Sequence, residues 1–359
     1  MRFSRWATLA AMTLASAPVL ATTSHEDRDD SAALQGWALV FENDLLGPST
    51  AQDRWFTNGL QLATAFQAGR EPAWLKPVLP LGRWLAATPC QTPACGVALT
   101  ASLGQNIYTP SHIEVATPQP ADRPWAGWLY GGIGLSVLQA HRHQALALKL
   151  GPTGPASLAE GTQHFAHCCL SSSEKRPRGW QHQLRPRLGV QFSYLSTHNH
   201  QGMGSWGWQT AWGGTLGNVR TMLVGAAALT WSIEPVAPTH PMDGGLDEGE
   251  FFTPDFSAQA MDGSWMSSLR RTVFYGHVQA SAVAYNVFLE GRTYAGHSQI
   301  TPVRGVATST IGLSVPFGEQ GRHKLNIAWK RRTPEFKVQG SDNRNLSQSW
   351  GLISYSHPY

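Results

Sequence analysis

A short polar stretch, Gly161-Thr-Gln-His-Phe-Ala-His167, combines residue types that can perform acid–base chemistry. It lies between two segments that have the pattern of β-strands. Gln163 and His167 are four residues apart, so one helical turn would place them on the same face. Histidine is the side chain most often used as a general base near neutral pH, and the glutamine could orient it or hold a substrate oxygen. The alternative is a solvated loop in which both side chains are merely polar surface.

The elements that would position such a site are indicated by the composition. Charged residues make up 14% of the 359 residues, whereas globular domains usually contain roughly 25%. The chain has 36 Gly, 23 Pro and 15 Trp, and its net charge is +4. The charge is spread along the chain without a basic cluster, which argues against nucleic acid as a partner. A mean hydropathy of −0.23 argues against a helical membrane protein. Together these features favour a β protein whose strands have two different faces.

The N-terminus predicts export. A basic start, Met1–Trp6, precedes an apolar run from Ala7 to Leu20 and a small-residue cleavage site at Val19-Leu-Ala21. This run is shorter than the ~20 residues that a membrane-spanning helix needs. We therefore expect a signal peptide at 1–21, a flexible polar segment at 22–33 and a single domain at 34–359.

The four cysteines of an exported chain point to an oxidising compartment. Cys90 and Cys95 lie in a turn-rich loop and are expected to form a local disulfide. Cys168 and Cys169 are adjacent, so a vicinal disulfide and two reduced thiols both remain open. A metal site with the neighbouring histidines is a further alternative, although no Cys-x-x-Cys spacing supports zinc.

From Leu34 onward, hydrophobic residues alternate with small or polar ones, as in β-strands. In one segment, Leu184, Leu188, Val190, Phe192 and Tyr194 are expected on one face, and Arg185, Arg187, Gln191 and Ser193 on the other. A soluble sandwich would also alternate. However, strands of about 10 to 15 residues with aromatic residues near their ends are typical of a transmembrane barrel. Because backbone groups in lipid must all be paired, such a sheet has to close.

We predict an all-β transmembrane antiparallel barrel of about twelve strands, with a short helix in an extracellular loop. The strands are expected at 36–44, 56–67, 97–108, 124–140, 143–151, 183–197, 204–213, 218–231, 271–286, 303–316, 321–332 and 347–359. If residue 34 starts in the periplasm, the outer loops are 45–55, 109–123, 152–182, 214–217, 287–302 and 333–346. Two inner connections, 68–96 and 232–270, are longer than usual. The second is rich in Pro, Gly and acidic residues and is expected to be an ordered loop or a small plug.

Several polar motifs fall at the expected outer ends of the strands. They are Phe41-Glu-Asn-Asp44, Asp53-Arg-Trp-Phe-Thr-Asn-Gly59, Gly104-Gln-Asn-Ile-Tyr-Thr-Pro110, Asp122-Arg-Pro-Trp-Ala-Gly-Trp128, Gln163-His-Phe-Ala-His167, Gly179-Trp-Gln-His-Gln-Leu184 and Arg332-Thr-Pro-Glu-Phe336. Each alone could be a turn signal. Together, and in this order, they resemble the lipid A 3′-O-deacylase family of outer-membrane β-barrel enzymes over residues 34–359.

The resemblance implies a calcium-dependent esterase that uses a histidine-activated water instead of a serine nucleophile. Residue by residue, the family's catalytic histidine corresponds to His167, and Gln163 lies one helical turn before it. The family's Asn-Asp pair corresponds to Asn43 and Asp44, and its threonine after the first outer loop corresponds to Thr57. The active site is expected between the barrel wall and a short helix in an outer loop, which suits segment 158–170.

The residue types fit this chemistry. Asn43 and Asp44 offer hard oxygens suited to Ca²⁺, and a cation there could polarise an ester carbonyl. Asp44 could instead hold His167 in the required tautomer, and the pair could also be only a hairpin turn. Thr57 is expected to face inward, in register with Gly59, Gln61 and Ala63. The spacing selects His167 over His164, which is three residues earlier.

The substrate-binding candidates lie in the same motifs or near the outer rim. Gln105 and Tyr108 belong to the third motif. Some family members carry a lysine in the loop that follows it, but here no Lys occurs between residues 76 and 149, which makes Arg123 the candidate for that role. Lys149 and Arg185 are the basic residues closest to the rim and could meet lipid A phosphates.

We therefore expect a monomeric enzyme in the outer membrane of a Gram-negative bacterium. It would hydrolyse the ester-linked 3′ acyl or acyloxyacyl chain of lipid A in the outer leaflet, with Ca²⁺ as cofactor and no nucleic-acid partner. One alternative is a non-catalytic barrel, either a porin or a structural protein. Another is an outer-membrane phospholipase with a His-Ser pair, for which His297-Ser298 is the only adjacent candidate.

Overall fold

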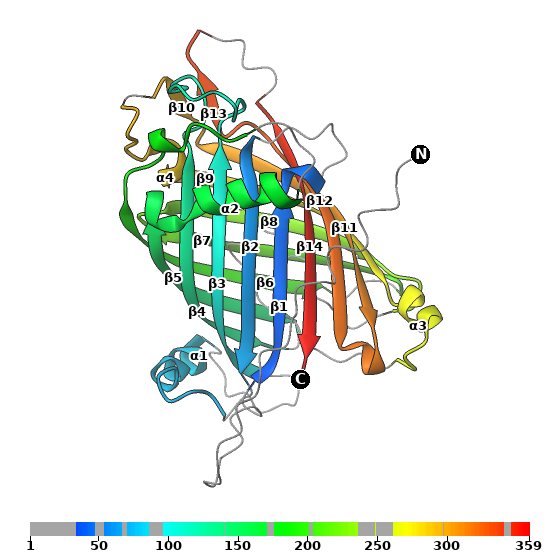
Figure 1. Ribbon diagram of the computed structural model, residues 1–359. Coiled ribbons are helices and arrows are strands. Elements are labelled where there is room, and N and C mark those ends of the chain that lie inside the picture. The colour runs from blue at the N-terminus through cyan, green and yellow to red at the C-terminus, as the bar shows by residue number, and fades with distance from the viewer. Residues whose placement is uncertain are drawn as a thin grey trace, which may run out of the picture. The chain divides into compact units, whose positions relative to one another are not determined.

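Twelve antiparallel strands close into a barrel in the computed structural model (Figure 1). The structure describes residues 34–46, 54–66, 70–85, 96–139, 141–170, 176–200, 204–235, 248, 261–296, 298–340 and 346–359. The barrel strands are β1 (Leu34–Asn43), β2 (Trp55–Phe66), β3 (Gly96–Thr109), β4 (Ala126–Leu138), β5 (Arg142–Thr153), β6 (Arg187–His200), β7 (Trp206–Gly217), β8 (Arg220–Trp231), β9 (Val273–Asn286), β11 (Gly305–Phe317), β12 (His323–Arg332) and β14 (Gln348–Pro358). Pairing of β1 with β14 closes the sheet, which confirms the predicted twelve-stranded barrel.

The alternation of side chains has the polarity of a membrane barrel. In β6, Leu188, Val190 and Phe192 are exposed, whereas Gln191 and Ser193 are buried. The apolar face is therefore outside and the polar face lines the lumen. Polar groups in the lumen satisfy one another: Lys330 Nζ lies 2.6 Å from Glu42 Oε1, which also accepts from the Trp350 indole at 3.1 Å.

The predicted alternation of side-chain faces fails just before β6. The strand begins at Arg187, so the residues ahead of it do not alternate with those inside it. Leu184 is buried and bridges to Thr293 in an outer loop, rather than facing lipid. Arg185 lies ahead of the strand and is exposed at the rim, so its predicted inward direction is wrong. Arg187 is exposed as well, but as the first residue of β6 it alternates in step with Gln191, and its Nη1 donates to the Tyr285 hydroxyl at 3.3 Å.

The outer connections carry most of the short elements. These are η2 (Asp44–Leu46), η4 (Gly154–Ser157), α2 (Ala159–Phe165), the π-helical turn η5 (Ala166–Leu170), η6 (Trp180–His182) and α4 (Val287–Glu290). The expected short helix in an outer loop is α2. Two further strands, β10 (Ile300–Pro302) and β13 (Phe336–Val338), pair above the barrel in segments expected to be loops.

The inner connections contain η3 (Lys76–Val78), α1 (Leu79–Leu85), α3 (Trp265–Arg270) and η7 (Glu319–Gly321). Among the described ranges, no helix has the length and apolar character needed to cross a membrane. The expected signal peptide, the flexible segment 22–33, the Cys90–Cys95 bridge and His297 all lie outside the described residues.

Candidate active site

A β-bulge in β2 decides which face of the wall Thr57 occupies. The two strands pair Phe56 with Tyr108 and Asn58 with the residue before Tyr108, so Thr57 is the extra residue. Tyr108 is directed into the lumen, which places Thr109 on the outer face. Thr57 Oγ1 lies 2.8 Å from Thr109 Oγ1, so Thr57 also faces outward. The expectation that it faces inward is wrong, because counting by two assumes a strand without a bulge.

Asn43 and Asp44 form a corner beside Thr57. Asn43 is the last residue of β1, and its Nδ2 donates to the Thr57 carbonyl at 2.9 Å while its Oδ1 accepts from Leu45 N at 2.8 Å. Asp44 is buried, and its Oδ2 accepts from Arg54 N at 2.8 Å. These bonds shape the β1–β2 hairpin and fix the amide of Asn43 directly against Thr57.

The outer face of β3 supports the loop that contains α2. Gln105 Nε2 donates to the Ser157 carbonyl at 2.6 Å, just before the helix begins. Two positions along the same face, Ile107 packs in a buried cluster with Ala159 and Trp180. Apolar burial and one hydrogen bond thus hold α2 against the outside of the barrel wall.

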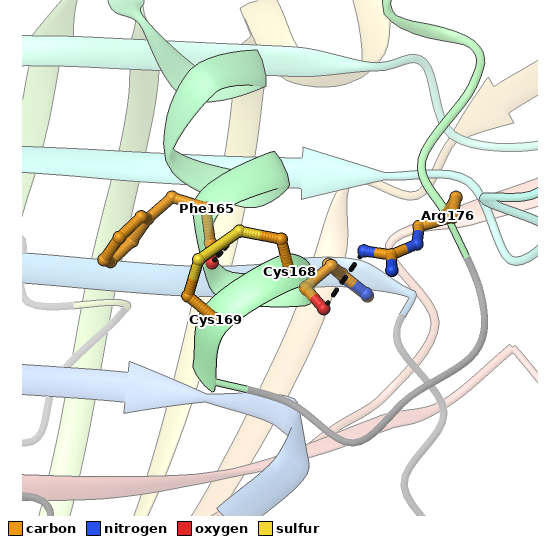
Figure 2. The surroundings of a disulfide bond; sticks show 5 residues. Phe165, Cys168, Cys169 and Arg176 are labelled. Atoms are coloured by element: carbon orange, nitrogen blue, oxygen red, sulfur yellow. Dashed lines mark hydrogen bonds between the residues drawn. A yellow bond between two sulfur atoms is a disulfide. The ribbon is translucent and has the colours of Figure 1, made fainter.

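A glycine in β4 allows this close approach. A Cβ on Gly127 would lie 2.2 Å from Ser157 Oγ and 2.3 Å from Ala159 Cβ. No side chain fits in that space, so glycine is required by the packing of the loop on the strand. Figures 1 and 2 both show the helix crossing the outside of β4, β3 and β2.

The helix separates the two histidines of the motif. Gln163 and His167 are 3% and 7% exposed, so both face the barrel wall. The side chain of His164 is 48% exposed and lies 3.9 Å from Glu160 on the solvent side. The expected helical turn, with Gln163 and His167 on one face, is present.

The amide of Gln163 is oriented by an indole. Trp180 Nε1 lies 2.8 Å from Gln163 Oε1, and both side chains are buried. Because an indole N–H can only donate, the amide oxygen must face it. Gln163 Nε2 is then a buried donor that has no hydrogen-bond partner among the described residues. The site therefore contains a fixed N–H group available to an incoming oxygen.

A vicinal disulfide follows His167 directly. Cys168 and Cys169 are joined within the π-helical turn, so the disulfide alternative is the one found (Figure 2). Arg176 Nη1 donates to the His167 carbonyl at 3.4 Å from the next described segment.

The five substrate-binding candidates do not lie together. Gln105 faces α2 on the outside of the wall, and Arg185 is exposed at the rim, with its Nε donating to the Thr293 carbonyl at 3.2 Å. Tyr108 and Lys149 lie in the lumen, on the opposite side of the wall from α2. Lys149 Nζ is 4.7 Å from the centre of the Tyr130 ring. Arg123 is buried, stacks on Tyr108 at 4.2 Å and pairs with Glu335 at 2.7 Å.

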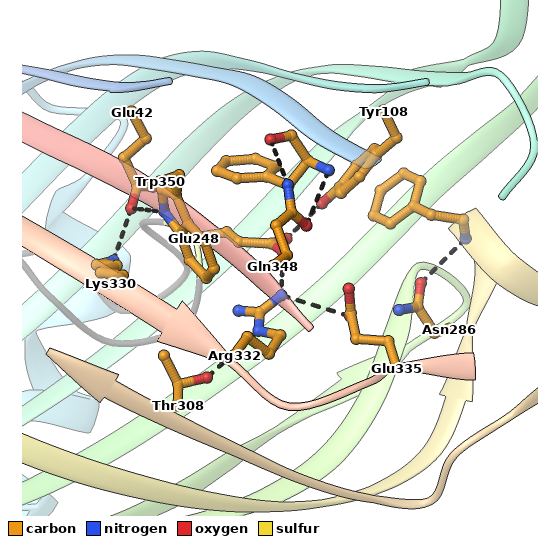
Figure 3. Close-up of polar contacts among 12 residues, drawn as sticks. Glu42, Tyr108, Glu248, Asn286, Thr308, Lys330, Arg332, Glu335, Gln348 and Trp350 are labelled. Carbon is orange, nitrogen blue, oxygen red and sulfur yellow. Dashed lines mark hydrogen bonds and ion pairs between the residues drawn. The ribbon is translucent and has the colours of Figure 1, made fainter. Parts of the chain in front are cut away.

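A charged cluster that no sequence motif predicted crosses the outer end of the lumen (Figure 3). Glu248 belongs to the long inner connection between β8 and β9, yet it is fully buried against residues of three distant strands. Tyr108 of β3 donates to its carboxylate at 2.5 Å, Arg220 of β8 does so at 2.9 Å, and Arg332 of β12 pairs with its other oxygen. Since these strands lie around the circumference, Glu248 must be inside the barrel.

The same cluster extends to the outer loop that contains Glu335. Burial acts to raise the pKa of Glu335, but the positive charges of Arg123 and Arg332 outweigh it, so the pKa lies below the usual carboxyl value. Next to this cluster, aromatic and aliphatic side chains fill the lumen: Phe56, Tyr108, Trp128, Val219, Phe288 and Trp350. The outer end of the barrel is a packed core rather than an open passage.

Oxygen donors of the kind that Ca²⁺ binds are present at the β1–β2 corner. The buried Asp44 carboxylate and the Asn43 amide oxygen are hard ligands, and the Asn43 amide nitrogen donates to the backbone carbonyl of Thr57. The described residues contain no group of three or more His, Cys, Asp and Glu side chains able to hold a metal. These oxygens fit a calcium ion whose remaining ligands are water or substrate oxygens.

Comparisons with known proteins agree with this architecture. The sequence pattern of a family described as outer membrane protein LpxR matches residues 7–359. Among solved structures, LpxR from Salmonella typhimurium is similar, with a TM-score of 0.64 and 17% identity over 90% of this chain and all of that one. The β-domain of the Bordetella autotransporter BrkA (TM-score 0.42, 8% identity, 91% and 100% covered) is less similar. So is the translocator domain of NalP from Neisseria meningitidis (TM-score 0.42, 9% identity, 91% and 89% covered). No curated protein sequence matches the chain.

Proposed function

The chain belongs to the LpxR family of outer-membrane lipid A 3′-O-deacylases, and on this premise we propose that His167 is the general base that activates water for ester hydrolysis. The enzyme is a hydrolase of the outer membrane.

One observation carries the proposal: the buried His167 lies in the turn η5 that directly follows α2, and α2 packs on the outside of the barrel wall. Thr57, Gln105 and Thr109 also face this side, away from the lumen. The acyl chains of a lipid in the outer leaflet lie against the same outer surface. A substrate can therefore enter sideways from the leaflet, without leaving the membrane or passing through the barrel.

We infer the following steps for the chain's own residues. His167 removes a proton from a water molecule as the water oxygen attacks the ester carbonyl carbon. The carbonyl oxygen becomes negatively charged, and the free N–H of Gln163 donates to it. The tetrahedral intermediate then expels the sugar oxygen, which takes the proton from His167. The products are a free fatty acid and lipid A with a 3′ hydroxyl group.

Asn43 and Asp44 are the residues that would hold Ca²⁺. When bound, the ion would supply Lewis-acid polarisation of the ester carbonyl. Arg185, at the exposed rim, is the basic residue best placed to meet a lipid A phosphate. Lys149 is less suitable because it lies on the lumenal side of the wall. We further propose that the enzyme acts as a monomer.

The two alternatives receive less support. A porin needs a water-filled lumen, but aromatic side chains and the Glu248 cluster occupy the outer end of this one. A His-Ser phospholipase needs an available serine, whereas Ser298 Oγ donates to the Pro120 carbonyl at 3.4 Å, far along the chain from α2.

The test is the lipid A of cells that express the chain. Mass spectrometry should show loss of the 3′ chain, and chelation of Ca²⁺ in isolated outer membranes should stop that loss. Activity that is unaffected by chelation would remove the cation from the proposal. An unchanged lipid A mass in every lipid background tested would contradict deacylation. If the unchanged chain removes acyl chains from phospholipids and Ser298→Ala does not, the phospholipase alternative is favoured.

A further inference from the structure

Helix α3, at the inner end of the barrel, exposes its large apolar side chains together with Arg270 in its last turn. Trp265, Met266 and Leu269 are 72%, 40% and 46% exposed, while Ser268 is buried against the protein. A surface helix in water normally buries its apolar stripe and exposes its polar side chains. The arrangement of α3 is favourable only if its outer face meets an apolar environment.

The three apolar residues form one surface. Positions 265, 266 and 269 lie within about 100° around a helix axis, whereas 268 points elsewhere. Figure 1 shows α3 on the outside of the barrel, beside the inner end of β11, against which it packs. The exposed face therefore points away from the barrel.

Hydrogen bonds fix α3 in this orientation. Ser264 caps the helix by accepting from Ser267 N at 3.2 Å, and Asp262 accepts from the Ser264 hydroxyl at 2.7 Å. At the other end, Thr272 Oγ1 donates to the Ser268 carbonyl at 2.8 Å. The exposure of the apolar face is thus a property of a capped helix rather than of a frayed end.

The apolar face of α3 continues the lipid-facing girdle at the inner end of the barrel. Trp206 and Trp231 lie 6.5 Å apart between ring centres, and Trp231 and Phe274 lie 5.6 Å apart. Ile233, just after β8, is half exposed. Aromatic residues at strand ends mark the boundary between lipid and water, so α3 lies at that boundary on the periplasmic side.

We propose that α3 is an interfacial anchor that inserts Trp265, Met266 and Leu269 into the inner, phospholipid leaflet of the outer membrane. Tryptophan suits this depth because it combines a large apolar ring with one N–H donor. The polar cap formed by Ser264 and Asp262 would remain at the level of the headgroups. This role is independent of the proposed catalytic residues, which lie at the opposite end of the barrel.

Site-specific photocrosslinking tests the anchor directly. The photoreactive residue p-benzoylphenylalanine would replace Trp265 in the full chain, and whole cells would be irradiated before intact-mass measurement. We expect adducts with the mass of a phospholipid. The same residue at Ser267, on the opposite side of the helix, should give at least tenfold less adduct, an order-of-magnitude expectation for a group outside the lipid phase. Adducts with a protein, or equal phospholipid adducts at both positions, would overturn the proposal.

A fluorescence measurement serves as an independent check. The protein would be reconstituted in vesicles of ordinary or brominated phosphatidylcholine, and the emission of a Trp265→Phe variant would be subtracted from that of the unchanged chain. The difference is the emission of Trp265 alone. We expect brominated lipid to reduce it by at least half. Equal emission in both lipids would place Trp265 in water and refute insertion.

Discussion

Trp180 is predicted to act as a positioning residue for Gln163. The substitution Trp180→Phe keeps an aromatic ring in the buried cluster with Trp125 but removes the N–H that faces Gln163 Oε1 at 2.8 Å. Without that donor, the amide can rotate by half a turn. Its oxygen would then point to where the oxyanion forms, and the stabilising N–H would be lost.

The size of the effect follows from the hydrogen bond. A buried acceptor that loses its donor costs about 1–3 kcal/mol. If that energy is what holds the amide in the productive orientation, kcat should fall about 5- to 150-fold. KM should change much less, because Trp180 makes its contact with Gln163 and not with the acyl chains.

The assay is release of fatty acid from purified lipid A in detergent micelles, measured as kcat and KM. Trp125→Phe is the matched control, since its ring lies 4.9 Å from that of Trp180 in the same cluster. In a Gln163→Ala background, Trp180→Phe should have little further effect, because both changes remove the same interaction. The reasoning is refuted if Trp180→Phe and Trp125→Phe reduce kcat equally. It is also refuted if Trp180→Phe lowers kcat by the same factor in the Gln163→Ala background as in the unchanged chain.

Three further predictions concern packing, charge and pH. Gly127→Val should displace α2 and lower kcat by about 100-fold, while gel mobility with and without heating shows that the barrel still folds. Gly131→Val, where a Cβ meets nothing within 4 Å, should leave kcat nearly unchanged. Equal losses of kcat in the two variants would contradict the packing of α2 on Gly127. Arg332→Met should lower the free energy of unfolding by about 3–5 kcal/mol, because it leaves Glu248 buried with one partner fewer. Arg304→Met, at an exposed pair with Glu290, should lower it by less than about 1 kcal/mol. Equal shifts of the urea midpoint in lipid for the two variants would contradict a stabilising role of the lumenal cluster. Because the pKa of folded Glu335 lies below its ordinary value, its contribution to stability is complete above the usual carboxyl range and is lost as the pH falls through the folded-state pKa. The urea midpoint should therefore fall less between about pH 7 and about pH 4 in Glu335→Gln than in the unchanged chain, and parallel curves would exclude that contribution.

The barrel could be predicted from the sequence because its physical signal is local. Alternation along β6 follows from one face in lipid and one in the lumen, and the side chains report it residue by residue. The short helix was expected from the family resemblance, which suited segment 158–170, and α2 with η5 occupies that segment. The ends of the strands were predicted less well. Arg185 continues the alternation in sequence, although β6 begins only at Arg187.

The position of Thr57 shows why a register count is fragile at a site. One extra residue reverses the face of a side chain, and nothing in Trp-Phe-Thr-Asn-Gly marks which residue is the extra one. The bulge matters because it brings Thr57 to the face on which Asn43, Thr109 and α2 lie. The Gly-Trp motif was noted in the sequence, but the role of Trp180 in orienting Gln163 required the structure.

Glu248 shows a different limit. The connection between β8 and β9 reads as an acidic, proline-rich segment, and a plug was one of two expectations for it. Its partners Tyr108, Arg220 and Arg332 come from three strands that are far apart in the chain. Such long-range ion pairs leave no pattern within any short window of sequence, so only the closed barrel reveals them.

The most direct test of the account compares two histidines that lie three residues apart, His164 on α2 and His167 in the turn η5 that follows it. Lipid A would be analysed by mass spectrometry from cells that produce equal amounts of folded His167→Ala, His164→Ala and unchanged protein. We expect that His164→Ala still removes the 3′ chain, because that side chain faces solvent. His167→Ala should leave lipid A intact. Removal of the 3′ chain by His167→Ala at an undiminished rate would contradict the central claim that His167 is the base.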